Sequence, residues 1–123
     1  MKALVVEDSR AVRAIIAEIL RDIGMEVVEA ADGGEGLEQM KRHTDIELML
    51  VDWNMPVMDG LEFIRVVRAD PVNNEVRIMM VTTESEGARV SQALEAGANE
   101  YLMKPFTKEI LIAKLNMMDV YEE

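Results

Sequence analysis

The sequence predicts a doubly wound α/β fold, in which one parallel sheet is covered by helices on both faces. Short apolar runs of strand length recur along the chain, and stretches with helical periodicity lie between them. Several runs are continuously apolar, which is typical of strands that are covered on both faces. Alternating strands and helices joined by right-handed crossovers place the strands in parallel and the helices on both sides of the sheet.

The composition agrees with one domain over residues 1–123. Half of the 123 residues are apolar and 30% are charged, which suits a single core with a well-solvated surface. The formal net charge of −11 argues against nucleic-acid binding, which needs clustered cations. The absence of cysteine excludes disulfides, zinc–thiolate sites and thiol chemistry. We expect a cytoplasmic protein without membrane contact, because the first apolar run is too short for a signal peptide or a membrane span.

The predicted strands are the short apolar runs themselves. They are Ala3 to Val6, Val27–Val28, Leu48 to Val51, Ile78 to Val81, and Tyr101 to Met103. The second run ends near Glu29 to Ala31 without a distinctive polar residue, so we expect it at an edge of the sheet.

The first helix is predicted from apolar residues at i, i+3 and i+4 spacing, which form one buried face. These residues are Val12, Ile15, Ile16, Ile19, Leu20 and Ile23. Gly24 follows at the position where a left-handed residue commonly ends a helix.

Later helices carry similar start and stop signals. Asp59 is a plausible N-cap for a helix that begins at Gly60, and Thr107 can cap the last helix, from Lys108 to about Val120. Gly97 ends another helix, which we expect to begin at Glu86-Gly87. The apolar residues expected on these helices include Leu61, Ile64, Val67, Val90, Ala93 and Leu94.

Polar residues follow four of the five predicted strands. They are Glu7 and Asp8 after the first, Asp52 after the third, Thr82 and Thr83 at the end of the fourth, and Lys104 after the fifth. Taken singly, each is more simply explained as a helix cap or a surface charge. Because sites in open parallel sheets form beyond the carboxyl ends of the strands, their shared position on one rim favours a functional site.

The chemistry of this set favours phosphoryl transfer. Three converging carboxylates repel one another, so they require a raised pKa or a bound cation. Oxygen ligands without His or Cys suit Mg²⁺. The Asp52 carboxylate can act as a nucleophile and form an acyl phosphate. Lys104 and Thr82 then supply a cation and a hydroxyl donor for the phosphoryl oxygens.

Several motifs together resemble the receiver domain of two-component response regulators over the whole chain. The matching stretches are LVVEDS, DWNMPVMDG, the VT of MMVTTES, EAGANEYLMKPFT, and LN near the end. Within that family the chain is most similar to the stand-alone chemotaxis regulators. The resemblance implies a flavodoxin-like sheet with strand order 2-1-3-4-5.

The resemblance also implies a role for each acidic residue. Asp52 would be the phosphorylation site. Asp8, Asp52 and the backbone carbonyl of Asn54 would bind Mg²⁺, and Glu7 would act largely through bound water. Lys104 would pair with the phosphoryl group, and its bond to Pro105 is expected to be cis.

Further positions correspond to the switch and to the tuning of the phosphoryl lifetime. Thr82 resembles the switch hydroxyl, and Tyr101 resembles the aromatic residue that swings inward after phosphorylation. Asn54 and Glu84 match the chemotaxis type at the tuning positions. Thr83 departs from the pattern, since a small residue is common there, and we expect its bulk to slow hydrolysis or to hinder small phosphodonors.

By this resemblance the protein is not an enzyme, because it catalyses only its own phosphorylation and dephosphorylation. A sensor histidine kinase would supply the phosphoryl group and a phosphatase would remove it. The monomer would bind its partner through the fourth helix, fifth strand and fifth helix, since no effector domain follows. A flagellar motor switch protein is the leading partner, although Glu86-Gly87 stand where the enteric chemotaxis protein has lysines. The alternatives are a phosphorelay carrier and a regulator of another machine.

Two other classes of protein share parts of this pattern. A haloacid-dehalogenase-like phosphatase needs an acid two residues after its nucleophile, where this chain has Asn54, and it needs a cap domain. A flavin-binding module needs a Ser-, Thr- and Gly-rich phosphate loop after the first strand, where this chain has VVEDSRAV. Both are therefore weaker hypotheses than the receiver.

Overall fold

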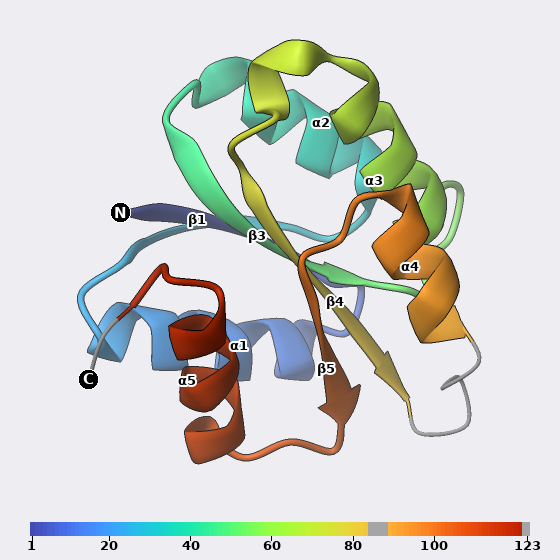
Figure 1. The fold of residues 1–123 in the computed structure, drawn as a ribbon. Coiled ribbons are helices and arrows are strands. Elements are labelled where there is room, and N and C mark those ends of the chain that lie inside the picture. Colours follow the sequence, from blue (N-terminus) through green and yellow to red (C-terminus); the bar gives the residue numbers. More distant parts are fainter. Residues whose placement is uncertain (84–88, 122–123) are drawn as a thin grey trace.

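The fold is a five-stranded parallel sheet with strand order β2-β1-β3-β4-β5 (Figure 1). The computed structural model describes residues 1–83 and 89–121. The strands are β1 (Lys2–Val6), β2 (Glu26–Ala30), β3 (Ile46–Asp52), β4 (Arg77–Thr83) and β5 (Glu100–Lys104). Each neighbouring pair is parallel, so the predicted sheet and its order are confirmed, and β2 lies at an edge as expected.

Helices cover both faces of the sheet. They are α1 (Arg10–Asp22), α2 (Gly33–Arg42), α3 (Gly60–Ala69), α4 (Val90–Ala96) and α5 (Lys108–Met117), with a short 3₁₀ turn, η1 (Pro71–Asn73). Figure 1 shows α1 and α5 on one side of the sheet and α2, α3 and α4 on the other. None of the helices within the described ranges is long and apolar enough to cross a membrane.

The core consists of two layers, one on each face of the sheet. Successive strand residues point to opposite faces, so Leu4 and Val6 pack toward α2 and α3, whereas Ala3 and Val5 pack toward α1 and α5. All four of these β1 residues are fully buried. The continuously apolar runs therefore have the predicted cause, which is burial of both faces of the sheet.

The predicted helix caps are confirmed. Asp59 accepts a hydrogen bond from Glu62 N at 2.9 Å, and Thr107 accepts one from Ile110 N at 3.2 Å. These side chains bond backbone donors that have no partner within the first helical turn. Gly24, with φ of 93°, follows the end of α1 in the left-handed region that glycine adopts without strain.

Some details of the helix predictions were wrong. Ile15 is 53% exposed, because the buried stripe of α1 is centred on Ile16 and Leu20 and Ile15 lies at its margin. Helix α5 ends at Met117 rather than near Val120. The expected start of the fourth helix, Glu86-Gly87, lies outside the described residues.

Candidate functional site

Three carboxylates converge where β1 and β3 end. Glu7 and Asp8 follow β1, and Asp52 is the last residue of β3. One oxygen from each lies within 4.8 Å of the other two. Glu7 and Asp52 are buried, at 1% and 4% exposure, whereas Asp8 is exposed. The cluster is therefore open to solvent on the Asp8 side and enclosed on the other.

Lys104, the last residue of β5, provides a cation shared by two of these carboxylates. Its Nζ lies 3.0 Å from Glu7 Oε1 and donates a hydrogen bond to Asp52 Oδ1 at 3.2 Å. Burial opposes its charge, but Glu7 and Asp52 outweigh that effect, so the pKa of Lys104 is raised. Lys104 is therefore protonated at neutral pH. Its peptide bond to Pro105 is cis, as the resemblance implies.

One cation does not satisfy three carboxylates. Burial, together with the neighbouring Glu7 carboxylate, raises the pKa of Asp52 to about 8, and Lys104 only partly opposes this rise. Glu7 Oε1 is fully buried and, despite its ion pair with Lys104, accepts no well-aligned hydrogen bond from the described residues. Hard oxygen donors with unsatisfied negative charge fit Mg²⁺, which keeps several of its own waters when it binds to proteins.

The backbone around Asp52 is held by two hydrogen bonds. Trp53 N donates to Val81 O at 3.0 Å, and Gly60 N donates to Trp53 O at 2.9 Å. A Cβ atom on Gly60 would lie only 2.4 Å from the Asp52 carbonyl oxygen. Glycine at this position therefore allows the loop that follows Asp52 to close against the strand. The sequence signal Asp59-Gly60 indicated only the start of a helix.

The hydroxyl and aromatic residues predicted to switch lie on the neighbouring strands. Thr82 is buried and follows Val81, which aligns with Asp52 in the β3–β4 pairing. Thr83 aligns with Lys104 in the β4–β5 pairing and is half-buried. Glu84 lies outside the described residues. The structure thus places Thr82 on the same rim as the carboxylates.

Tyr101 lies on β5 and is half-buried. Lys114 Nζ, from α5, lies 3.9 Å from the centre of its ring. The same ammonium group pairs with Glu100 Oε1 at 3.1 Å, and Tyr101 N donates to that oxygen at 3.0 Å. The ring therefore contacts a cation that is itself fixed by the adjacent residue.

Arg89 is a residue near the site that the sequence analysis did not identify. Its guanidinium lies 5.1 Å from the centre of the Trp53 ring. Its Nη1 donates to Asn54 Oδ1 at 3.5 Å. Arg89 thereby joins the start of α4 to the two residues that follow Asp52. The sequence around Arg89 contains no motif that would have predicted this contact.

Residues 3–116 match the response regulator receiver domain. The chain belongs to the response regulator receiver family. It is 44% identical to chemotaxis protein CheY1 of Helicobacter pylori over 119 residues, which is 96% of each chain. It is also 44% identical over 116 residues to a CheY homologue of Campylobacter jejuni, covering 94% of this receiver and 89% of the relative. The solved structure of CheY4 from Vibrio cholerae superposes on 98% of each chain, with a TM-score of 0.86 and 35% identity.

Membership of this family accounts for the general character of the site. CheY-like receivers are signalling switches rather than enzymes that turn over a separate substrate. Receiver domains bind Mg²⁺ at an acidic pocket, and the cluster of Glu7, Asp8 and Asp52 can hold such an ion. The comparison therefore agrees with the ligand type that the charges and oxygen donors indicate.

Proposed function

We propose that this receiver is a phosphoacceptor switch that carries its phosphoryl group on Asp52. The observation that supports this most is the convergence of Glu7, Asp8 and Asp52 on one rim, with Lys104 bonded to Asp52. An Asp52 carboxylate oxygen would attack the phosphorus of a phosphohistidine on a sensor kinase. The P–O bond forms as the P–N bond breaks, and the histidine keeps the electron pair and takes up a proton.

Mg²⁺ would be held by the carboxylates of Asp8 and Asp52 and by the backbone carbonyl of Asn54. Glu7 would contribute largely through bound water. When bound, the ion would neutralise charge on the phosphoryl oxygens. Lys104 is already placed beside Asp52 Oδ1 and would pair with the phosphoryl group.

Thr82 and Tyr101 would convert the added charge into a change of surface. The Thr82 hydroxyl would move to donate to a phosphoryl oxygen, and the space it leaves would admit the Tyr101 ring. Tyr101 lies on the edge strand β5 and its ring contacts Lys114 of α5, so its movement would alter the face formed by α4, β5 and α5. Asn54, Thr83 and Glu84 would tune the lifetime of the phosphoryl group.

Residues 1–123 would act as a single receiver unit, as a monomer in the cytoplasm, without nucleic-acid or membrane binding. The relatives named above are chemotaxis proteins, which favours a partner in chemotaxis, such as a flagellar motor switch protein. A sensor histidine kinase would phosphorylate the protein, and a phosphatase would dephosphorylate it. The alternative is a phosphorelay carrier or a regulator of a partner unrelated to motility. The partner-capture experiment below distinguishes this alternative from a motor-binding regulator.

Trp53 fluorescence tests the site directly, because Trp53 adjoins Asp52 and is the only tryptophan in the chain. Adding Mg²⁺ and then beryllofluoride, which mimics a phosphoryl group on a carboxylate, should change the emission in two steps. Asp52→Ala should abolish the second step. A beryllofluoride response that persists in Asp52→Ala would show that the acceptor is another residue.

The output is tested by partner capture. The immobilised protein, with and without Mg²⁺ and beryllofluoride, is incubated with purified flagellar switch protein. Binding in the activated state alone supports the motor assignment. Equal binding in the two states, or none, would contradict it and favour the alternative.

A further inference from the structure

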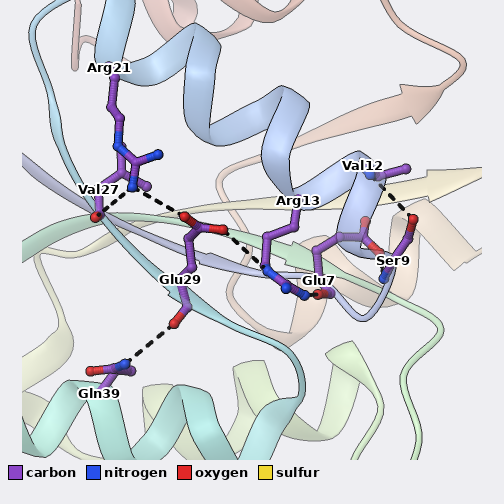
Figure 2. Close-up of polar contacts among 8 residues, drawn as sticks. All are labelled: Glu7, Ser9, Val12, Arg13, Arg21, Val27, Glu29 and Gln39. Atoms are coloured by element: carbon purple, nitrogen blue, oxygen red, sulfur yellow. Dashed lines mark hydrogen bonds and ion pairs between the residues drawn. The ribbon is translucent and has the colours of Figure 1, made fainter.

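The carbonyl group of Glu7 has an unusual partner for a residue that directly follows a strand. The last β1 residue in both strand pairings is Val6, so Glu7 lies just beyond the ladder. Its N–H still donates to Ala30 O at 3.0 Å. Its carbonyl oxygen instead accepts a hydrogen bond from Arg13 Nη1 at 2.8 Å (Figure 2). A guanidinium from α1 therefore holds the backbone at the point where the acidic pair begins.

Arg13 is itself fixed in place by the edge strand. Its Nε donates to Glu29 Oε1 at 3.3 Å, and its side chain is only 18% exposed. The other oxygen of Glu29 accepts from Arg21 Nη2 at 3.2 Å, and the Glu29 carbonyl accepts from Gln39 Nε2 at 3.4 Å. Figure 2 shows Glu29 between Arg13 and Arg21 of α1. The planar guanidinium thus bridges a β2 carboxylate and the Glu7 carbonyl.

Fixing this carbonyl has a consequence for both acids. Because a peptide unit is planar, the direction of the Glu7 carbonyl sets the plane that leads into Asp8. On the other side of the turn, Glu7 Oε2 accepts from Ser9 N at 3.1 Å. The Arg13 bond and the Ser9 bond together restrain the turn that carries the two carboxylates.

We propose that Arg13, held by Glu29, is a positioning residue for the metal-binding acid pair Glu7 and Asp8. This inference rests on the proposed function, in which these acids bind Mg²⁺. Arg13 contributes no ligand. It holds the two acids in the orientation that binds Mg²⁺, so that they are already ordered before the ion binds.

Removing Arg13 has two opposite effects on Mg²⁺ binding. Loss of a positive charge near the site strengthens attraction of the cation, whereas loss of the restraint weakens binding. Arg13→Lys separates the two effects, because it keeps the charge and loses the restraint; salt at about 0.5 M reduces the electrostatic effect as well, although less for a partly buried side chain such as Arg13 than for an exposed one. The effect of the restraint on local geometry remains at that salt concentration.

The test is a Mg²⁺ titration of the full chain at about 0.5 M KCl, followed by Trp53 fluorescence, with unfolding measured in EDTA. Arg13→Ala should weaken Mg²⁺ binding about tenfold, the scale of one lost hydrogen bond to a charged donor. Arg21→Ala is the matched control, because it removes a cation from the same Glu29 carboxylate without touching Glu7. Its Mg²⁺ affinity should stay within about twofold of wild type.

Arg13→Lys keeps the charge but loses the planar fork that bonds Glu29 and Glu7 together, and it should weaken Mg²⁺ binding at least about threefold. This variant serves as the test if Arg13→Ala does not fold. Wild-type Mg²⁺ affinity in the Arg13 variants, or an equal loss of affinity in Arg21→Ala, would overturn this inference and leave the proposed function intact. Absence of Mg²⁺ binding by the wild type would contradict the proposed function, and the inference with it.

Discussion

Lys104 Nζ donates to Asp52 Oδ1 at 3.2 Å, and so links the end of β5 to the proposed phosphoacceptor at the end of β3. The same nitrogen lies 3.0 Å from Glu7 Oε1. Without metal, Lys104 is therefore the cation that offsets the buried carboxylates. In the proposed phosphorylated state the Lys104 ammonium would pair with the phosphoryl oxygens instead.

Replacement of Lys104 should consequently have opposite effects on the two ligands. Lys104→Ala removes a positive charge from a cation site, so Mg²⁺ should bind at least as tightly as it does to wild type. The beryllofluoride complex loses a charge-assisted hydrogen bond and should bind about tenfold more weakly. Trp53 fluorescence titrations measure both constants. Parallel weakening of the two would show that Lys104 acts only through the stability of the fold.

The raised pKa of Asp52 predicts how stability depends on pH. In the folded, metal-free protein the pKa of Asp52 is about 8, against about 3.9 in an unfolded chain. Between these values the folded state holds a proton that the unfolded state releases. The free energy of unfolding should therefore fall as pH rises from about 5 to about 8 in EDTA.

The matched variant for this pH dependence is Asp52→Asn, which removes the titrating group. It should flatten that part of the profile and, at pH 8 without metal, raise the free energy of unfolding by about 1–3 kcal/mol. Urea unfolding at a series of pH values gives both results. An unchanged slope in Asp52→Asn would mean that another group is responsible.

Gly60 should be intolerant of any side chain. Gly60→Ala places a Cβ 2.4 Å from the Asp52 carbonyl oxygen, and this contact is with backbone, which cannot move aside cheaply. We expect a loss of at least about 2 kcal/mol in the free energy of unfolding, together with weaker Mg²⁺ binding. Gly34→Ala, at an exposed position of α2, is the control and should stay within about 1 kcal/mol of wild type. Equal effects of the two substitutions would argue against the clash.

Lys114 should influence the position of Tyr101. The ammonium lies 3.9 Å from the ring centre, a contact worth about 0.5–1 kcal/mol at a partly exposed site. With 3-fluorotyrosine incorporated, Lys114→Ala should shift the ¹⁹F resonance of Tyr101 toward its position in the beryllofluoride complex. The only other tyrosine, Tyr121, serves as an internal reference. A Tyr101 resonance that does not respond to Lys114→Ala would contradict this coupling.

The sequence predicted the sheet, the helices and the rim of polar residues, because each depends on a local pattern. A continuously apolar strand, a cap such as Asp59 and a glycine such as Gly24 carry their structural meaning in adjacent residues. The polar residues could be placed together because parallel strands end on one edge of the sheet. Strand order itself was taken from the resemblance to a known family.

The parts that were missed depend on distant pairs. The bond from Arg13 to the Glu7 carbonyl has no sequence signature, because any long donor on the polar face of α1 would look the same. Glu29 had been given no specific role at the end of the edge strand, yet it anchors Arg13. The predicted burial of Ile15 was wrong because the spacing of apolar residues locates the apolar stripe of a helix but not the edge of its buried part.

The phosphorylation of Asp52 is tested most directly by intact mass. The protein is incubated with Mg²⁺ and either acetyl phosphate or a phosphorylated sensor kinase, and Asp52→Asn is treated in parallel. Wild type should gain about 80 Da, which is one phosphoryl group, and lose it in hydroxylamine, as an acyl phosphate does; Asp52→Asn should gain nothing. The same adduct on Asp52→Asn, or no adduct on wild type with either donor, would contradict the proposal.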